Sequence, residues 1–264
     1  MAESKLKLAV SGATGRMGRT VIRLCQEASD LTLVGACAAS GDPHLGEDAG
    51  TLAGAQAAGV AVTDDMAAAL LGADVVVDFS LPAALKLLAR HAAREKVALV
   101  SGTTGVEDLS PLDDAATQVP VLWAANMSIG VQVLSELAAE ATRRLGPGFE
   151  IEITEVHHKR KVDAPSGTAL RLGEAIREVR PLRPVTGRDG IVGARPSDEL
   201  GIFALRGGDV IGDHTVYLFG PGERLELTHR ATSRDLFAQG ALRAARWVVG
   251  KPPRRYTLAD ALRG

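Results

Sequence analysis

The segment from Glu155 to Ala169, EVHHKRKVDAPSGTA, is the most unusual part of the sequence. Two of the chain's six histidines and three of its basic residues fall within positions 157–161. A strand-like segment precedes them, and a Pro-Ser-Gly-Thr sequence that can begin a helix follows. Because a helix N-terminus attracts anions, this combination predicts a pocket for a small carboxylate. A solvated basic turn is the alternative explanation for such a run of charges.

Adjacent histidines also raise the question of a metal ion. Zinc sites use three or four ligands from the protein. No third ligand stands at a useful spacing from His157 and His158. We therefore expect no metal at this site.

A glycine-rich segment near the start of the chain has the spacing of a dinucleotide-binding loop. Leu6–Val10 is a short apolar run typical of a buried strand, and apolar residues at helical spacing begin at Met17. The junction between them carries glycines at positions 12, 15 and 18. Glycines there let the backbone approach a pyrophosphate at the positive end of the following helix. A turn with a purely structural role is the alternative.

Two further segments follow predicted parallel strands at the end where open α/β sheets bind ligands. Gly102-Thr103-Thr104-Gly105 comes after a strand over Val97–Ser101, and Ala124-Ala125-Asn126-Met127 comes at the end of a strand over Val121–Ala124. Each segment alone is explained equally well as a turn. Together with the glycine loop, they predict contacts to the nicotinamide end of a dinucleotide.

The side chains that normally select between NAD and NADP are missing from their usual place. An acidic residue about 20 positions after the loop holds the ribose 2′-OH, whereas an arginine accommodates a 2′-phosphate. That position falls on Ala38-Ala39-Ser40, with Asp42 as the nearest acid and Arg16 and Arg19 as the nearest cations. The sequence therefore predicts NADH and/or NADPH, with poor discrimination between them.

The pattern of elements changes near Met127. Before it, apolar strands separated by helices indicate a parallel sheet covered on both faces. After a predicted helix over Ile129–Leu145, residues 150–156 alternate with period two, and glycine-rich turns join the later strands, which favours a mostly antiparallel sheet. A last helix over Asp235–Val249 resembles the first half again. We expect an α/β protein with two domains: an N-terminal Rossmann dinucleotide-binding domain (1–126 plus 235–264) and an α+β domain (127–234).

Composition excludes several classes of protein. The 264 residues are 46% hydrophobic and 23% charged, which is enough to bury a core. A net charge of −2 gives no global attraction to nucleic acid or to an anionic membrane. Two cysteines and the lack of a long apolar segment fit a reducing compartment. We expect a soluble, cytoplasmic protein with a small-molecule partner.

With these motifs, the sequence resembles the dihydrodipicolinate (4-hydroxy-tetrahydrodipicolinate) reductase family of lysine and diaminopimelate biosynthesis. The resemblance is carried by residues 12–18, 102–105, 124–127 and above all 155–169. It implies NAD(P)H-dependent reduction of the cyclic dicarboxylate to tetrahydrodipicolinate, by hydride transfer and then protonation. It also implies a substrate-binding second domain whose sheet builds a homotetramer. Many members carry an acidic residue and an arginine where this chain has Ala38-Ala39, so the resemblance implies no choice between NADH and NADPH.

The resemblance further implies roles for individual residues. His157 matches the family's acid/base histidine and Lys161 its proton-donating lysine, whereas His158, Gly167 and Thr168 match its contacts to the substrate carboxylates. The cofactor contacts that it implies are Gly12, Ala13, Thr14, Gly15, Arg16, Met17, Gly102, Thr103, Thr104, Ala124, Ala125, Asn126 and Met127. A reductase for another small carboxylate and a dinucleotide sensor without catalysis are the alternatives, although a sensor has no need of a proton donor.

Overall fold

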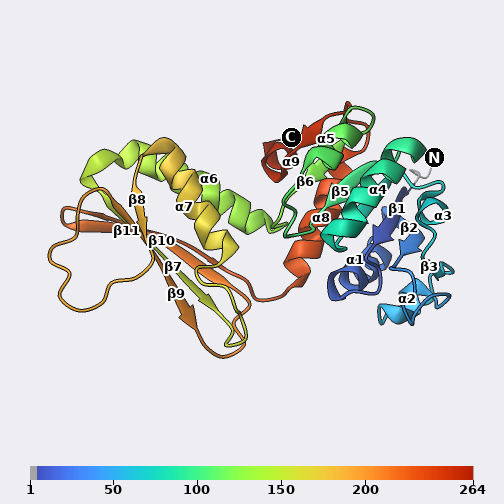
Figure 1. Cartoon of the computed structure of the whole chain (residues 1–264), viewed down its shortest axis with the longest axis horizontal. Coiled ribbons are helices and arrows are strands. Elements are labelled where there is room, and N and C mark those ends of the chain that lie inside the picture. Colours follow the sequence, from blue (N-terminus) through green and yellow to red (C-terminus); the bar gives the residue numbers. More distant parts are fainter. Residues whose placement is uncertain (1–4, 264) are drawn as a thin grey trace. The chain divides into compact units, whose positions relative to one another are not determined.

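The computed structural model describes residues 5–263, which fall into two units (Figure 1). Residues 1–4 and 264, which the expected first domain includes, lie outside the described residues. Unit 1 is the chain up to Ile129 together with the chain from Asp235 onward, and unit 2 is Gly130–Arg234. Each unit has its own sheet, so the predicted α/β class with a Rossmann-like unit and a second sheet unit is confirmed.

The sheet of unit 1 contains seven strands in the order β12-β6-β5-β4-β1-β2-β3, and all of its pairs are parallel. Its strands are β1 (Leu6–Ser11), β2 (Leu31–Cys37), β3 (Val62–Thr63), β4 (Val75–Asp78), β5 (Ala98–Ser101), β6 (Val121–Trp123) and β12 (Arg255–Tyr256). The chain moves outward from β1 to β3 and then returns to β4 on the other side of β1. The carboxyl ends of β1 and β4 therefore flank the switch point at which open sheets bind ligands.

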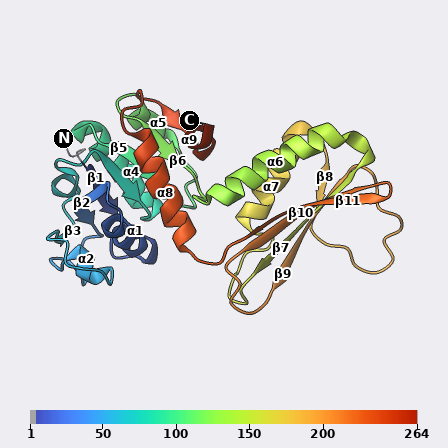
Figure 2. The same cartoon turned by 180° about the vertical axis from the view of Figure 1, so that it is seen from behind.

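Helices cover both faces of this sheet. Figures 1 and 2, which view opposite sides, show α4 (Pro82–Glu95) over one face and α8 (Asp235–Val248) over the other. Helix α1 (Arg16–Glu27) packs beside α8, as the sequence predicts for a last helix that rejoins the first half. The remaining helices are α2 (Ala49–Leu52), α3 (Met66–Leu70), α5 (Ser110–Ala116) and α9 (Leu258–Arg263). Successive residues of β1 face different layers, since Leu8 belongs to the core under α1 and α8 and Ala9 to the core under α4.

The sheet of unit 2 has the order β11-β10-β7-β9-β8. Its strands are β7 (Glu150–His157), β8 (Arg183–Val185), β9 (Glu199–Arg206), β10 (Asp213–Gly220) and β11 (Glu223–Arg230). The prediction of a mostly antiparallel sheet is wrong for half of the pairs, because β7 pairs with β9, and β8 with β9, in parallel. The reason is two crossover connections: α7 (Gly167–Val179) leads from β7 to β8, and residues 186–198 lead from β8 to β9, so that all three strands run in the same direction.

One face of this second sheet carries the core of unit 2. Helices α6 (Ile129–Leu145) and α7 lie over it, and a short 3₁₀ turn, Gly146–Gly148, leads from α6 into β7 (Figure 2). Ile151 and Ile153 of β7 are buried beneath these helices. Because side chains alternate along a strand, Glu155 and His157 point to the same side. Within residues 5–263, no helix has the length and apolar character that a bilayer crossing requires.

Candidate active site

The glycine loop follows β1 directly, and its glycines stand where a side chain has no room. Gly12 has a φ of +73°, and a Cβ there would lie 2.7 Å from the carbonyl oxygen of Phe79. A Cβ on Gly18 would lie 2.1 Å from the carbonyl oxygen of Gly12, so helix α1 can start close to the loop only with glycine at this position. Helix α1 begins without a side-chain cap and has no acidic residue in its first turn. An anion is the natural partner for such a helix end.

Polar side chains join this loop to the segment after β2. The Thr14 hydroxyl donates to the Asp42 carboxylate at 2.7 Å, and Arg19 Nε donates to the Thr14 carbonyl at 2.8 Å. Arg19 also lies 3.2 Å from His44 Nε2. Asp42 thus contacts the glycine loop, although it lies a few residues after residues 38–40, where a ribose-binding acid is expected. The sequence did not predict a role for His44, because a single histidine in a loop belongs to no recognisable motif.

The predicted segment Gly102–Thr104 is held by an unpredicted buried carboxylate, that of Asp78. Thr103 is 2% exposed and its hydroxyl donates to Asp78 at 2.7 Å, while its carbonyl accepts from Trp123 Nε1 at 3.0 Å. The Ser101 hydroxyl donates to the same Asp78 oxygen at 2.7 Å. These contacts mean that the Thr103 side chain holds the loop in place and is not available to a ligand. The neighbouring Thr104 is exposed. A lone Asp ending the apolar run Val75–Asp78 was the signal that could have revealed this carboxylate.

The third predicted segment, Ala124–Met127, follows β6. Residues 124–126 are half-buried, but Met127 is 1% exposed and belongs to the core under α1 and α8. A Cβ on Gly240 of α8 would lie 1.8 Å from the Met127 carbonyl oxygen, so backbone packing fixes this residue. All three predicted cofactor segments therefore lie at the carboxyl edge of the parallel sheet, after β1, β5 and β6.

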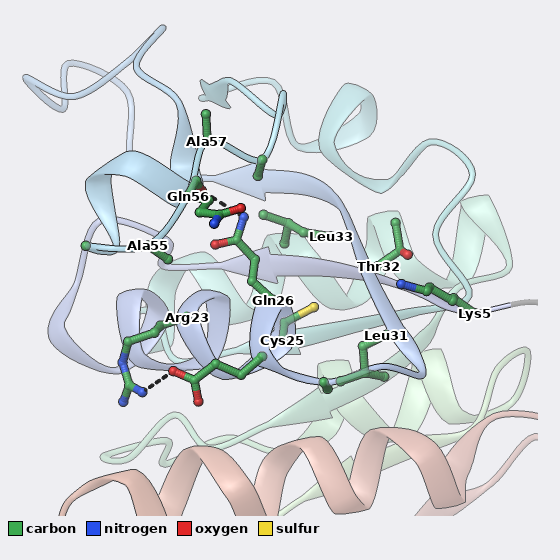
Figure 3. A pocket seen from close by; sticks show the side chains of 14 residues that line it. Lys5, Arg23, Cys25, Gln26, Leu31, Thr32, Leu33, Ala55, Gln56 and Ala57 are labelled. Atoms are coloured by element: carbon green, nitrogen blue, oxygen red, sulfur yellow. Dashed lines mark hydrogen bonds and ion pairs between the residues drawn. The ribbon is translucent and has the colours of Figure 1, made fainter.

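A pocket of about 610 Å³ lies elsewhere in unit 1 (Figure 3). It is lined by the end of α1, the start of β2 and residues 54–58, and none of the predicted site residues is among its lining residues. Cys25 is part of this lining, and burial raises the pKa of its thiol to about 11. The sulfur is therefore a neutral, buried thiol at physiological pH.

In unit 2, Glu155 is the first residue of the predicted segment 155–169 and the centre of its hydrogen-bonded cluster. Its side chain is fully buried at the end of β7, and one carboxylate oxygen lies 2.6 Å from His157 Nδ1. Arg206, at the end of β9, donates to both carboxylate oxygens at 2.8 Å. The backbone N–H of Ser166 donates to Glu155 at 2.9 Å. Burial alone would raise the pKa of Glu155, but the hydrogen bonds from Arg206, His157 and Ser166 outweigh it, and the pKa is lowered.

The environment of His157 fixes its protonation state. Burial lowers its pKa, which the contact with Glu155 only partly offsets, and the charges of Lys161 and Arg206 lower it further. His214 of β10 packs edge-on against the His157 ring at a centroid distance of 5.2 Å. Burial, followed by the neighbouring His157, lowers the pKa of His214 to about 4. Both rings are therefore neutral near pH 7.

The other predicted residues of unit 2 surround this cluster. Lys161, 21% exposed in its side chain, pairs with Asp163 at 2.9 Å and thereby lowers the pKa of that carboxyl. His158 is half-buried, and its Nδ1 has no hydrogen-bond partner among the described residues. Gly167 and Thr168 form the first turn of α7, behind Ser166 as the N-cap. Within residues 5–263, no three side chains of His, Cys, Asp or Glu are placed to share a metal ion.

Arg206 and His214 were not among the predicted residues. Arg206 lies 51 positions from Glu155, so only the strand register brings the two together. The sequence of β7 does indicate that Glu155 is buried, because it alternates in step with Ile151 and Ile153, whose side chains point into the core. A carboxylate at a buried position requires a charged partner.

Known proteins resemble the chain along its whole length. A family model described as "Dihydrodipicolinate reductase, N-terminus" matches residues 6–127, and one described as "Dihydrodipicolinate reductase, C-terminus" matches residues 130–262. A protein of Anaeromyxobacter dehalogenans (strain 2CP-1) named 4-hydroxy-tetrahydrodipicolinate reductase is 51% identical over 262 residues, which covers 97% of both chains. A protein of the same name from Myxococcus xanthus (strain DK1622) is 48% identical over 264 residues, again with 97% of both chains covered.

Solved structures show the same fold. A dipicolinate-bound dihydrodipicolinate reductase from Paenisporosarcina sp. TG-14 has a TM-score of 0.79 and 24% identity, and the match covers 96% of this chain and 97% of that one. GenD2 from gentamicin A biosynthesis, in complex with NAD, has a TM-score of 0.60 and 16% identity, covering 99% of this chain and 91% of that one.

Proposed function

The chain belongs to the dihydrodipicolinate reductase family, as its motifs predicted, and from that premise we propose that it reduces 4-hydroxy-tetrahydrodipicolinate to tetrahydrodipicolinate with NAD(P)H. This is a step of lysine and diaminopimelate biosynthesis. The observation that carries the proposal is about 50% identity, along nearly the whole chain, to relatives with this name. The buried Glu155–His157 pair and the adjacent Lys161 supply suitable acid–base groups.

Unit 1 fits a nicotinamide dinucleotide. Gly12 and Gly18 leave no space for side chains, and the uncapped start of α1 offers its positive end to a pyrophosphate. The residues that would hold the cofactor are those from Gly12 to Met17, with the backbone at 102–104 and 124–127. When bound, the reduced nicotinamide supplies a hydride to the electron-poor ring of the substrate.

Unit 2 supplies the binding and protonation of the substrate. His158 and the first turn of α7, with Gly167 and Thr168, would hold the two carboxylates and so fix the face of the ring that is reduced. The Lys161 ammonium would stabilise the negative charge that develops on the conjugated ring and donate a proton to it. His157 is the acid/base residue that exchanges the proton near neutral pH.

The face of the unit 2 sheet opposite α6 and α7 supports the proposal of a homotetramer. Leu200 and Ile202 of β9 face the helices, so Phe203 and Leu205 both point toward the other side of the sheet, where Leu205 is 51% exposed. Tyr217 and Phe219 of β10 stack on the same side with ring centroids 5.8 Å apart, and Arg188 packs there over the ring of Phe203. A sheet face that combines these aromatic and aliphatic side chains with charged ones such as Glu152 fits an interface between copies of a chain. Sedimentation velocity of the purified protein tests whether it is a tetramer. We also propose that the protein acts in the cytoplasm.

Cofactor preference is expected to be weak. Neither Ala38 nor Ala39 provides a carboxylate for a ribose hydroxyl or a cation for a 2′-phosphate. We expect kcat/KM values for NADH and NADPH within about 100-fold of each other. A larger ratio would contradict this expectation and direct attention to Arg19, Asp42 and His44.

The test is to follow the near-ultraviolet absorbance of reduced nicotinamide while the purified protein meets freshly prepared 4-hydroxy-tetrahydrodipicolinate. NADH and NADPH are used in separate reactions. Oxidation that depends on the substrate supports the proposed function. Cofactor binding without oxidation would contradict it and would favour a dinucleotide sensor or a different carboxylate substrate.

A further inference from the structure

One buried carboxylate joins the three parts of the candidate site of unit 2. Glu155 contacts the ring of His157, the backbone N–H of Ser166 at the start of α7, and the guanidinium of Arg206. Arg206 in turn donates to the carbonyl of Asp163, at 2.6 Å, in the loop that carries Lys161. The acid/base ring, the helix N-terminus and the basic loop are therefore tied to a single group.

We propose that Glu155 and Arg206 are positioning residues for His157, because the ionised carboxylate holds the Nδ1 proton and leaves Nε2 as the acceptor that faces the substrate. The inference deepens the proposed function and rests on it for the identity of the substrate. The hydrogen-bonding state of His157, however, can be measured without any substrate.

The chemistry of the three groups determines which atom carries the proton. Arginine has only donors, so its two contacts with Glu155 require the carboxylate oxygens to accept. An ionised carboxylate cannot donate to His157, so the short contact of 2.6 Å requires a proton on Nδ1. A neutral ring with a proton on Nδ1 has its lone pair on Nε2.

The surroundings of Nε2 are consistent with this arrangement. Gly212 is adjacent to the ring, and a Cβ there would lie 2.9 Å from Nε2, so glycine keeps this side of the ring clear of a side chain. The charged and titratable groups that act on His157 are Glu155 on its own strand, Lys161 in the following loop, Arg206 on β9 and His214 on β10. Among these four, Glu155 alone favours protonation, and Arg206 opposes it.

Substitutions of the two positioning residues should therefore shift the titration of His157 in opposite directions. Glu155→Gln removes the negative charge and should lower the pKa of His157 by about one unit, whereas Arg206→Gln should raise it by a similar amount. We expect kcat to fall about 10- to 100-fold in both variants, with little change in the affinity for the cofactor. Opposite shifts show that both charges act on His157, and loss of the hydrogen-bonded Nδ1–H signal in Glu155→Gln shows that Glu155 positions the ring.

The experiment is nitrogen-15 NMR of histidine-labelled, full-length protein, with the pH–rate profile measured in parallel. The proposal predicts a hydrogen-bonded Nδ1–H tautomer for His157 in the unmodified protein, and the two opposite shifts in the variants. Asp78→Asn, which alters a fully buried carboxylate of unit 1, is the matched control and should leave the His157 signals in place. Arg206→Lys, which keeps the charge and loses the paired contact, should fall between the unmodified protein and Arg206→Gln.

Several outcomes would overturn the proposal. They are an Nε2–H tautomer in the unmodified protein, shifts of the same sign in the two variants, and an unchanged kcat in either. If Glu155→Gln does not fold, the Arg206 variants still decide the sign of the shift. If the unmodified protein shows the expected tautomer but reduces no 4-hydroxy-tetrahydrodipicolinate, the proposed function fails, and with it the role of Nε2 toward that substrate, while the link from Glu155 to His157 stands.

Discussion

Each unit of the chain has a fully buried carboxylate near the end of a central strand, and the two carboxylates differ in their partners. Asp78, in unit 1, accepts hydrogen bonds from the hydroxyls of Ser101 and Thr103. Glu155, in unit 2, is bound by the guanidinium of Arg206 and by a histidine ring. The first carboxylate holds neutral groups that shape a loop, whereas the second is coupled to a group that gains and loses protons.

The two positions should differ in how well they tolerate an amide in place of the carboxylate. A hydroxyl can donate or accept, so the partners of Asp78 can turn toward an amide placed there. Arginine can only donate, so the partners of Glu155 cannot adapt in the same way. The candidate site of unit 1 thus depends mainly on backbone shape, whereas the candidate site of unit 2 depends on side-chain charge.

The largest expected effect on stability tests this comparison directly. Glu155→Gln should lower the free energy of unfolding by about 3 kcal/mol, because the half-buried guanidinium of Arg206 loses its fully buried counter-ion. Asp78→Asn should cost about 1 kcal/mol, because Ser101 and Thr103 can reorient. Urea unfolding of both variants and the unmodified protein measures the difference. Equal losses would show that the partners' chemistry does not distinguish the two sites.

The largest expected effect on catalysis belongs to Lys161. Lys161→Ala should lower kcat by about 10²–10³, the usual scale for one proton-donating or charge-stabilising group. Arg16→Ala, at the glycine loop of unit 1, should act mainly on the KM of the cofactor. Steady-state kinetics with both substrates varied separates the two effects, and a near-normal kcat in Lys161→Ala would remove this residue from the chemistry.

The two units should also differ in their response to pH. Burial lowers the pKa of His214 in unit 2 from 6.5 to about 4, so the unfolded chain binds a proton that the folded chain does not. Stability is therefore complete above about pH 6.5 and decreases as the pH falls toward 4, by at most about 3 kcal/mol from this residue. In unit 1, burial raises the pKa of Cys25 and Cys37 from 9.0 to about 11, so their contribution is present below pH 9 and is lost as the pH rises from there toward 11.

Spectroscopy can follow the units separately. Trp123 and Trp247 both belong to unit 1, so tryptophan fluorescence reports on that unit, and far-ultraviolet circular dichroism reports on both. On mild acidification, we expect the dichroism transition in urea to move before the fluorescence transition. His214→Gln should reduce this separation. Coincident transitions at every pH would indicate that the units unfold together.

The sequence predicted the parts of the molecule that depend on local pattern. The strand, glycine loop and helix over residues 6–27 follow from apolar spacing and from the positions of three glycines, and the structure has them in place. The period-two strand that ends at His157 and the helix start after Pro165 are equally local features. These elements place most of the candidate residues without any knowledge of distant contacts.

The parts that the sequence did not predict depend on strand register. Arg206 contacts Glu155 because β9 pairs in parallel with β7, and an expectation of antiparallel pairing gives a different set of neighbours. His214 lies opposite Glu155 only through the pairing of β10 with β7. Such contacts arise between segments far apart in the chain, where local pattern carries no information about the partner.

The smallest expected effect compares two neighbouring histidines of unit 2. His157 is hydrogen-bonded to Glu155, whereas His158 Nδ1 has no partner among the described residues and its ring is half-buried. If the Glu155 cluster carries the proton chemistry, His158→Ala should raise the KM for the dicarboxylate about tenfold and change kcat little, since one charge-assisted contact is lost. His157→Ala should instead lower kcat. An unchanged KM in His158→Ala would place the carboxylate pocket elsewhere, and a kcat loss equal to that of His157→Ala would mean that the two rings act as one unit.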